Sequence, residues 1–394
     1  MKSLLIITTI PDTLTAFLLP FARHFRTLGW RVDAMASGIS ICEKCKDEFE
    51  HLWEVEWSRN PLDPRNLLLA PRQIQAAMQQ GEYDIVHAHT PVAAFVTRYA
   101  LRNYRNQVKT KVIYTAHGFH FHSGGTAFKN TVFLGLEKIA GNWTDYLITI
   151  NREDEAAANH HRLISAEKIR YMPGIGVDLD YYSANTTDHV GVEHVRRELG
   201  LGFDTKLLLS VAEFIPRKHP QDILRAFASL NPTNTCLAFA GDGDLLEEMQ
   251  QLAIQLGIQD KVRFLGHRDD IPTLMRAAFA TILASEQEGL PRSVMESLCL
   301  ETPVIGSDIR GTRDLIASEG GILFPVGNIE KLASGIEYLL NHPQEAYMMG
   351  KRGRERMSNF DLSHVIKLHE NLYAEALSPK SKIIKECLIQ NKLT

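Results

Sequence analysis

Short apolar runs alternate with longer amphipathic stretches along the chain, and the alternation occurs twice. Apolar runs that end in Gly, Pro or Asp, with helical patterns such as residues 15–28 between them, are typical of βα units around a parallel sheet that is buried on both faces. We expect strands at residues 4–8, 32–36, 85–89, 111–117, 146–150 and 169–172, and again at 206–211, 236–240, 262–265, 280–285, 304–307 and 322–324. The sequence therefore predicts an α/β fold of two doubly wound, Rossmann-like domains.

The length of 394 residues also indicates two domains, because it exceeds what one ordinary hydrophobic core supports. Residues 173–202 show little periodicity and suggest a linker, so we place an N-terminal domain at residues 1–184 and a C-terminal domain at 185–361. Residues 362–377 have helical spacing, and we expect this helix to pack back toward the N-terminal domain. The lysine-rich tail at 378–394 is expected to fray. Two such domains imply a cleft.

Composition excludes several classes of protein. The chain is 44% hydrophobic and 23% charged, and no run approaches the roughly 18 apolar residues of a membrane-spanning helix. Five cysteines, an odd number in a chain without an export-signal pattern, suggest reduced thiols and a cytoplasmic location. Cys42 and Cys45 have CxxC spacing but lack a second pair of ligands, so we expect no metal there.

A net charge of −4 gives no general attraction to nucleic acid. Residues 98–111 are the local exception, since this stretch is basic and holds no acidic residue. Its cations are Arg98, Arg102, Arg105, Lys109 and Lys111. Two interpretations remain open: a solvated helix end and loop, or a patch that makes peripheral contact with the anionic inner face of the plasma membrane.

The sharpest chemical signal is the pair Glu288 and Glu296, which follows a predicted strand and spans the start of a helix. Pro291 suits a first helical turn, where free backbone amides can meet an anion. The two carboxylates would lie up to about 12 Å apart at 1.5 Å per residue, which fits a ligand with hydroxyl-rich ends and a diphosphate between them. One would accept hydrogen bonds from sugar hydroxyls and the other from a ribose diol. The alternative is a helix with one carboxylate near its positive end and the other in solvent.

Residues 288–311 resemble the signature of the family-four retaining glycosyltransferases of the GT-B fold. Residues 84–91 and 144–154 resemble segments of the members that assemble capsule and exopolysaccharide. The resemblance implies that Glu288 contacts the donor sugar and takes part in catalysis, and that Glu296 contacts the nucleotide ribose. The turn Gly289, Leu290 and Pro291 joins them as part of the donor-binding site.

His117 and Gly118 follow a predicted strand, at the edge where open α/β sheets bind ligands. The resemblance implies that His117 points at the donor sugar and is catalytic, and we place Gly118 and His120 on the acceptor side. A histidine in such a position is otherwise a hydrogen-bonded polar residue of the core. His87 and His89 lie on an earlier strand, and we expect only one of them to face the cleft.

Residues 210–218 follow the first strand of the second domain and end in Arg217 and Lys218. An ammonium group beside a diphosphate binds it and offsets the charge of the departing nucleotide. The resemblance assigns Lys218 to the donor phosphate, as a catalytic and donor-binding residue, and we add Arg217 to the same site. Many relatives carry arginine where this chain has Glu213, so this carboxylate must turn away, pair with Arg217 or serve another role.

Two glycine turns complete the donor side. Gly241 ends one strand and Gly266 another, and the resemblance implies that both lie at the donor, with the backbone at Gly266 and His267 holding the base. The spacing of Asp242 and Asp244 is compatible with a metal site. The resemblance opposes this, because Lys218 and helix amides would replace the cation, so we expect no metal and no cofactor other than the sugar nucleotide substrate.

The resemblance implies metal-independent transfer of a hexose or acetamidohexose from a nucleoside diphosphate sugar, by analogy a UDP-sugar. The acceptor would be a glycan or a polyprenyl-diphosphate-linked intermediate of cell-surface polysaccharide or lipopolysaccharide synthesis. No carboxylate nucleophile paired with an acid is apparent, which favours front-face substitution. A UDP-sugar 2-epimerase of the same fold and a catalytically inactive sugar-nucleotide-binding subunit remain alternatives. A nicotinamide dehydrogenase would require GxGxxG after the first strand, and this chain lacks it.

Overall fold

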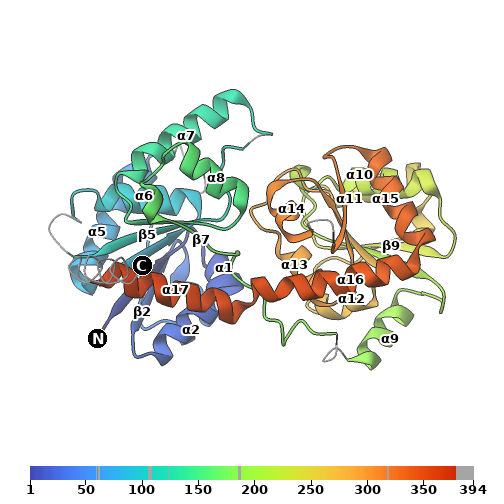
Figure 1. Cartoon of the computed structure of the whole chain (residues 1–394), viewed down its shortest axis with the longest axis horizontal. Helices are drawn as coiled ribbons and strands as arrows, with labels where there is room; N and C mark the ends of the chain where they lie inside the picture. Colours follow the sequence, from blue (N-terminus) through green and yellow to red (C-terminus); the bar gives the residue numbers. More distant parts are fainter. Residues whose placement is uncertain are drawn as a thin grey trace, which may run out of the picture. The chain divides into compact units, whose positions relative to one another are not determined.

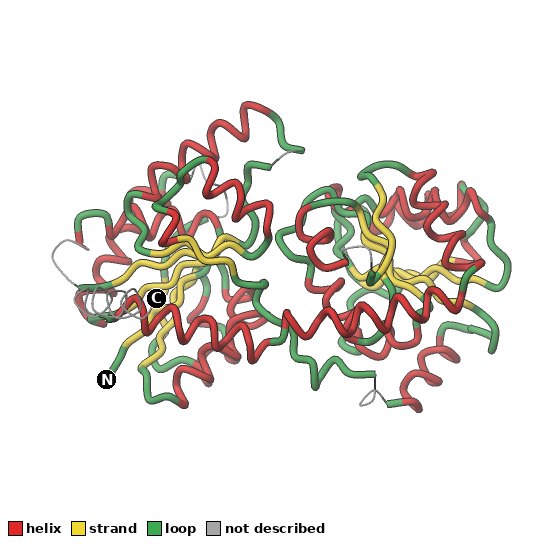
Figure 2. Tube along the Cα trace, viewed as in Figure 1, coloured by secondary structure: helices red, strands yellow, loops and turns green. Residues whose placement is uncertain are grey.

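The computed structural model describes residues 1–58, 60, 63–104, 109–122, 124–184, 188–316 and 319–378. It divides into two compact units, the first formed by Met1–Ile175 together with the chain from His364 onward, the second by Gly176–Ser363 (Figure 1). Each unit contains one parallel sheet with helices on both of its faces (Figure 2). The predicted pair of doubly wound domains is confirmed.

The sheet of the first unit has strand order β3-β2-β1-β4-β5-β6-β7, and all its neighbouring strands are parallel. Its strands are β1 (Ser3–Ile7), β2 (Arg31–Ala36), β3 (Leu52–Glu54), β4 (Ile85–His89), β5 (Lys111–Ala116), β6 (Tyr146–Thr149) and β7 (Ile169–Tyr171). The predicted strands are confirmed to within two residues at each end. Only β3 was not predicted, because it is a short edge strand without a buried apolar run.

Helices cover both faces of this sheet. One face packs against α5 (Ala70–Gly81) and α6 (Pro91–Leu101) through a core that includes Leu5, Val86 and Val112. The other helices of the unit are α1 (Pro11–Thr13), a π-helical turn at Leu14–Leu18, α2 (Leu19–Thr27), α3 (Glu43–Glu48), α4 (Arg65–Leu68), α7 (Ala127–Gly141), α8 (Arg152–His160) and α17 (Leu362–Leu377).

The last helix, α17, lies against α2 (Figure 1). The ring of Tyr373 packs 4.8 Å from that of Phe25 and 5.9 Å from that of Trp30, measured between ring centroids. The C-terminal part of the same helix is tied to β7 by an ion pair of 2.6 Å between Glu375 and Arg170. The C-terminal segment of the chain therefore completes the first unit, on the sheet face opposite α5 and α6. The tail at 379–394 lies outside the described residues.

The sheet of the second unit has strand order β10-β9-β8-β11-β12-β13 and is also fully parallel. Its strands are β8 (Lys206–Val211), β9 (Thr235–Ala240), β10 (Val262–Phe264), β11 (Ala280–Leu283), β12 (Val304–Ser307) and β13 (Gly321–Phe324). Its helices are α9 (His189–Glu198), α10 (Pro220–Leu230), α11 (Leu246–Gln255), α12 (Ile271–Ala277), α13 (Arg292–Cys299), α14 (Arg310–Ile316), α15 (Ile329–Asn341) and α16 (Pro343–Met357). Separate apolar cores fill its two faces.

The chain passes from the first unit to the second after Ile175, whereas the sequence pattern placed the boundary after residue 184. The intervening segment has no periodicity, but it packs on the second unit. Val177 bridges Asp361, and the buried side chain of Tyr182 joins the core of that unit. Residues 185–187, where the predicted boundary falls, lie outside the described part of the chain.

Candidate functional site

The two strand orders define a switch point in each sheet, where consecutive connections leave in opposite directions. In the second unit this point lies between β8 and β11. Ligands of open parallel sheets bind outside the carboxyl ends of strands at such points, because the two departing loops leave a crevice there. The loops in question are residues 212–219 and 284–291, and they carry Lys218 and Glu288.

The structure brings Lys218 and Glu288 into direct contact. The ammonium of Lys218 donates a hydrogen bond to Oε1 of Glu288, and Nη1 of Arg217 lies 3.5 Å from the same oxygen. Lys218 and Glu288 are each largely buried, with side-chain exposures of 14% and 13%. The carboxylate thus faces two cations, and the group of three carries a net positive charge.

Backbone contacts hold the two loops together. The backbone N–H of Glu286 donates to the carbonyl of Arg217 at 2.9 Å, and the hydroxyl of Ser285 donates to the same carbonyl at 3.2 Å. Nη1 of Arg217 donates in return to the carbonyl of Gln287 at 3.2 Å. These bonds position the cations of one loop against the carboxylate of the other.

The turn from Glu288 to Pro291 is shaped by close backbone packing. A Cβ atom at Gly311 would lie 2.2 Å from the carbonyl oxygen of Gly289, so only glycine allows α14 to pack on this turn. The buried Arg310 donates from Nε to the carbonyl of Glu288 at 3.0 Å. Leu290 packs on the neighbouring core.

The sequence pattern placed Pro291 in the first turn of a helix. In the structure Pro291 is the N-cap of α13 and precedes that turn. Its side chain cannot cap the helix, so the first backbone amides of α13 have no side-chain cap. Uncapped amides at a helix start, together with the helix dipole, favour an anion. Glu288 lies in the preceding loop, outside the helix.

Glu296 is buried on α13 and held by two residues that the sequence analysis did not single out. The hydroxyl of Tyr182 donates to Oε1 of Glu296 at 2.6 Å, and Nε of Arg292 donates to the same oxygen at 2.7 Å. The open interpretation of a second glutamate facing solvent is therefore wrong. Arg292, four residues earlier on the same helix face, could have been read from the sequence, but Tyr182 could not, because it reaches Glu296 from a segment without periodicity.

The glycine turns meet at the same edge of the sheet. The backbone N–H of Gly241 donates to the carbonyl of Gly266 at 2.8 Å, and both glycines have a positive φ, 146° and 63°. A Cβ at Gly241 would clash at 2.1 Å with the carbonyl oxygen of Ala212, in the loop after β8. The side chain of His267 is 80% exposed, so only its backbone belongs to the turn.

Asp242 and Asp244 are both exposed. In the part of the chain that the structure describes, no group of three or more His, Cys, Asp or Glu side chains is placed to hold a metal ion. Burial raises the pKa of the Cys45 thiol to about 12, so this member of the CxxC pair is protonated at neutral pH.

Glu213, the departure from the pattern of relatives, turns away from the cations. Its side chain is exposed, and Arg217 directs its guanidinium to Glu288 and Gln287 instead. Of the roles that the sequence left open for Glu213, pairing with Arg217 is not the one observed. The carboxylate therefore does not neutralise either cation of the switch-point loops.

In the first unit the switch point lies between β1 and β4. Thr9, after β1, and Thr90, after β4, hydrogen-bond through their hydroxyls at 2.6 Å. Thr90 has a φ of 65°, which a β-branched residue rarely adopts. Strain of this kind persists where surrounding contacts fix it and often accompanies a functional site. No pattern in the sequence indicated Thr90 as a site residue.

Next to this point lies a cluster of four histidines: His87, His89, His117 and His369. Nδ1 of His89 lies 3.0 Å from Nε2 of His117, and His87 bonds Thr115 at 2.7 Å and Tyr373 at 2.5 Å. His369 and Tyr373 come from α17. They are too far in sequence from the other residues of the cluster for a local pattern to predict the contact.

The expectation that only one of His87 and His89 faces the cleft assumed that the two alternate across the sheet, and this assumption is wrong. Residues two apart on a strand point to the same face of the sheet, and here the ring centroids are 4.1 Å apart. Burial lowers the pKa of both well below the usual value. It lowers the pKa of His117 and of His369 to about 4. The cluster is therefore neutral at physiological pH, and His117 is its partly accessible member.

Asp154 and Asn151 hold the start of the loop that follows His117. The buried carboxylate of Asp154 accepts a hydrogen bond from the backbone N–H of Phe119 at 3.2 Å, and Asn151, the N-cap of α8, holds Asp154. Gly118, with a φ of 122°, makes the turn. His120 is exposed, with its ring centroid 5.0 Å from that of Phe133.

The basic stretch at 98–111 is not a continuous exposed patch. Arg98 is 1% exposed and lies inside the unit. Its guanidinium stacks 4.1 Å above the ring of Tyr114 and pairs with Glu137 at 3.0 Å. Arg105 lies outside the described residues, which leaves Arg102, Lys109 and Lys111. Among the helices that the structure describes, none is long and apolar enough to span a bilayer.

Comparison with known proteins gives the same assignment for both halves. Residues 16–181 match the model of Glycosyltransferase Family 4, and residues 192–356 match that of Glycosyl transferases group 1. EpsD of Bacillus subtilis, named as a glycosyltransferase, is 31% identical, with 97% of this chain and 98% of that protein aligned. The UDP-Gal:alpha-D-GlcNAc-diphosphoundecaprenol alpha-1,3-galactosyltransferase of Escherichia coli is 25% identical over 77% of this chain and 78% of its own.

Solved structures agree on the fold. Anabaena HepE in complex with UDP-glucose has a TM-score of 0.78 at 20% identity, covering 96% of this chain and 99% of its own. Sucrose-phosphate synthase of Thermosynechococcus elongatus has a TM-score of 0.80 at 19% identity, covering 95% and 99%. This level of likeness establishes the two-domain GT-B fold.

The neutral histidine cluster predicts an acid-sensitive first unit. A histidine with a folded-state pKa near 4 and an unfolded value near 6.5 contributes stability above pH 6.5 that is lost as the pH falls toward 4. Each such group lowers the free energy of unfolding by up to about 1.4 kcal/mol per pH unit in that window. We expect urea unfolding of the first unit to shift to lower urea between pH 7.5 and 5.5, where carboxylates stay ionised.

Tryptophan fluorescence isolates this transition, because Trp30, Trp53, Trp57 and Trp143 all belong to the first unit. His369→Gln should reduce the pH dependence, whereas His189→Gln, at an exposed position of the second unit, should leave it unchanged. A pH-independent unfolding midpoint in the unmodified chain would contradict the neutral state of the cluster.

Proposed function

The chain belongs to the glycosyltransferases of group 1 and family 4, and we propose that it transfers a hexose or acetamidohexose, with retention of configuration, from a UDP-sugar to a lipid-linked glycan. The observation that carries the proposal is the contact of Lys218 and Glu288 at the switch point, with Arg217 beside it and the uncapped start of α13 nearby. Cations and free amides suit a diphosphate, and a carboxylate suits sugar hydroxyls.

In this proposal each site residue of the second unit has one role. Lys218 and Arg217 bind the diphosphate, and Glu288 accepts hydrogen bonds from hydroxyls of the donor sugar. Glu296 accepts hydrogen bonds from the ribose, and Tyr182 and Arg292 position its carboxylate through their hydrogen bonds to Oε1. The backbone at Gly241, Gly266 and His267 borders the base.

The choice of UDP is supported by relatives and not by a side chain that reads the base. HepE has been solved with UDP and with UDP-glucose, and the Escherichia coli relative is named for UDP-Gal. The same relative is named for a diphosphoundecaprenol-linked substrate, which supports a polyprenyl-diphosphate acceptor here and work at the inner face of the membrane. Polysaccharide or lipopolysaccharide assembly is the setting that such an acceptor implies.

The chemistry that fits these residues is front-face substitution. The bond from the anomeric carbon to the donor phosphate oxygen breaks, the acceptor oxygen bonds to the same face of that carbon, and the acceptor proton passes to the leaving diphosphate. Lys218 stabilises the charge that develops on this diphosphate. We assign neutral His117 to hydrogen bonding with the transferred sugar, with His89 fixing its ring. Gly118 and His120 are assigned to the acceptor.

Glu288→Gln should lower transfer about 10- to 100-fold at saturating donor, because an amide replaces a charged acceptor of hydroxyl hydrogen bonds. Nucleotide release from a panel of UDP-, GDP- and ADP-sugars measures the effect without a known acceptor and also identifies the base. Glu247→Gln, an exposed change in the same unit, is the matched control. Turnover like that of the unmodified chain would remove Glu288 from the site.

Lys218→Ala should weaken binding of UDP about 10-fold or more and leave uridine binding unchanged, because the lost ammonium contacts only phosphate. Calorimetric titration of both ligands measures the difference, with exposed Lys331→Ala as control. Equal losses for UDP and uridine would contradict a phosphate role for Lys218.

Transfer should survive removal of divalent ions, because Lys218, Arg217 and helix amides supply the positive charge that a metal provides in other enzymes. Activity is measured after dialysis against EDTA and again with added magnesium or manganese. Loss with EDTA and recovery with either ion would assign the diphosphate charge to a metal instead.

A further inference from the structure

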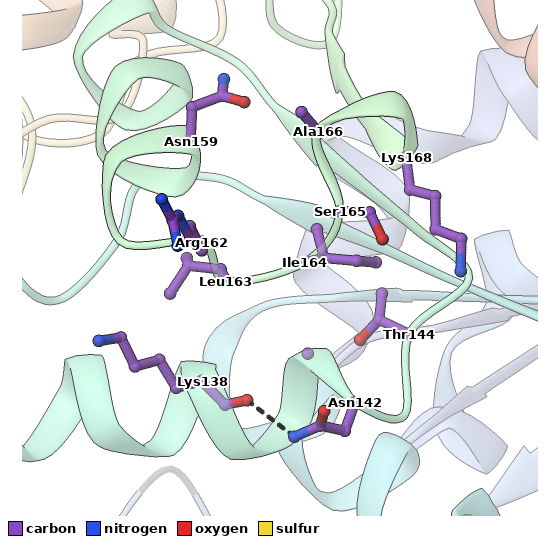
Figure 3. A pocket seen from close by; sticks show the side chains of 11 residues that line it. Lys138, Asn142, Thr144, Asn159, Arg162, Leu163, Ile164, Ser165, Ala166 and Lys168 are labelled. Carbon is purple, nitrogen blue, oxygen red and sulfur yellow. Dashed lines mark hydrogen bonds between the residues drawn. The ribbon is translucent and has the colours of Figure 1, made fainter.

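A second basic site lies at the opposite edge of the first sheet from the histidines. It is a pocket with a volume of about 620 Å³ between the end of α7 and the loop that follows α8 (Figure 3). The strands β6 and β7 begin beside it, whereas His89 and His117 follow the carboxyl ends of β4 and β5. The pocket is therefore separate from the site described above.

The pocket is lined by three cations and no carboxylate. Lys138, Arg162 and Lys168 line it together with neutral side chains that include Asn142, Asn159 and Ser165. Among the contacts of the described residues none of the three cations forms an ion pair, in contrast to Arg98, which Glu137 neutralises. Figure 3 shows Lys138 and Arg162 on one side of the pocket and Lys168 on the other. Unpaired cations that line one cavity favour a multiply charged anion.

The backbone at Arg162 carries a conformation that glycine would adopt more readily. Arg162 has a φ of 51° and follows the end of α8, the place where glycine or asparagine is usual. Arginine at this position is disfavoured by the backbone, so its presence there points to a use for the side chain. This observation is independent of the charge count.

Side chains also donate hydrogen bonds to the carbonyl groups at the end of α7, which would otherwise repel an anion. The amide of Asn142 donates to the carbonyls of Lys138 and Ile139, and the hydroxyl of Thr144 donates to that of Ala140 at 2.8 Å. A Cβ at Gly141 would lie 1.8 Å from the carbonyl oxygen of Leu163, so this glycine permits the close approach that forms the pocket wall. The negative end of α7 is thereby covered.

We propose that this pocket binds a phosphate-bearing anion through Lys138, Arg162 and Lys168. Cations on two sides of the cavity suit a diphosphate or a phosphorylated headgroup better than a single monovalent ion. An apolar face on the same helix adds a lipid as one source of the phosphate, because Phe128, Val132 and Ile139 are 80%, 44% and 51% exposed. A free phosphate compound is the other source.

Calorimetric titration of inorganic diphosphate into the full chain tests the pocket, with Arg217→Ala and Lys218→Ala together as background so that the two cations assigned to the donor diphosphate do not contribute. We expect binding in this background, weakened at least 10-fold by Arg162→Gly and abolished when Lys138→Gln and Lys168→Gln are added. Exposed Lys109→Gln, outside the pocket, is the control. Because glycine suits the positive φ, Arg162→Gly should keep or raise the thermal midpoint, which separates lost binding from lost folding.

Sedimentation with phosphatidylglycerol vesicles, compared with phosphatidylcholine vesicles, identifies the source. Selective binding to phosphatidylglycerol that the triple variant loses assigns the anion to a lipid headgroup. Diphosphate binding without vesicle binding assigns it to a free phosphate compound. If the triple variant matches its parent in both measurements, the pocket does not recognise phosphate and the proposal is overturned.

Discussion

Every pair of neighbouring strands in both sheets is parallel, so each connection must cross a face of the sheet before the next strand begins. This constraint gathers the loops that follow the strands at one edge of each sheet. At the switch points two such loops meet without a helix between them. Lys218 and Glu288 meet there in the second unit, and Thr9 and Thr90 meet there in the first. The chemistry of the protein depends on this arrangement, because residues 70 positions apart in sequence become hydrogen-bonded partners.

The sequence allowed the architecture and the centre of the candidate site to be predicted, for different reasons. Strands were readable because buried parallel strands contain short apolar runs, as at β8 and β12. Glu288, Glu296 and Lys218 were found from their placement after such strands and from the family resemblance. The partners of Glu296 and of the histidines were not found. Tyr182 lies in an aperiodic segment. Tyr373 contacts His87, and His369 contacts Phe21, each across more than 250 residues of sequence, so no local pattern reveals these contacts.

The prediction of a basic surface from charge alone was wrong at a residue that is buried. Arg98 counted as part of a basic surface in the sequence, yet its ring contact with Tyr114 and its pair with Glu137 place it inside the unit. A buried cation needs such a partner, whereas the cations at the pocket edge do not, since solvent reaches them. Lys138, Arg162 and Lys168 come from separate elements, so no run of basic residues in the sequence announces them.

The two units differ in the charge of the side chains at the carboxyl edges of their sheets. The switch point of the second unit holds a contact group of three ionised side chains with one positive charge in excess, because the Glu288 carboxylate faces both Arg217 and Lys218. At the edge of the first unit burial keeps the four histidines uncharged. A neutral imidazole exchanges hydrogen bonds with hydroxyl groups without attracting a phosphate, while a cation pair attracts phosphate strongly. This division favours diphosphate recognition at the carboxyl edge of the second sheet and hydroxyl recognition at that of the first, which is the division of labour that sugar transfer requires.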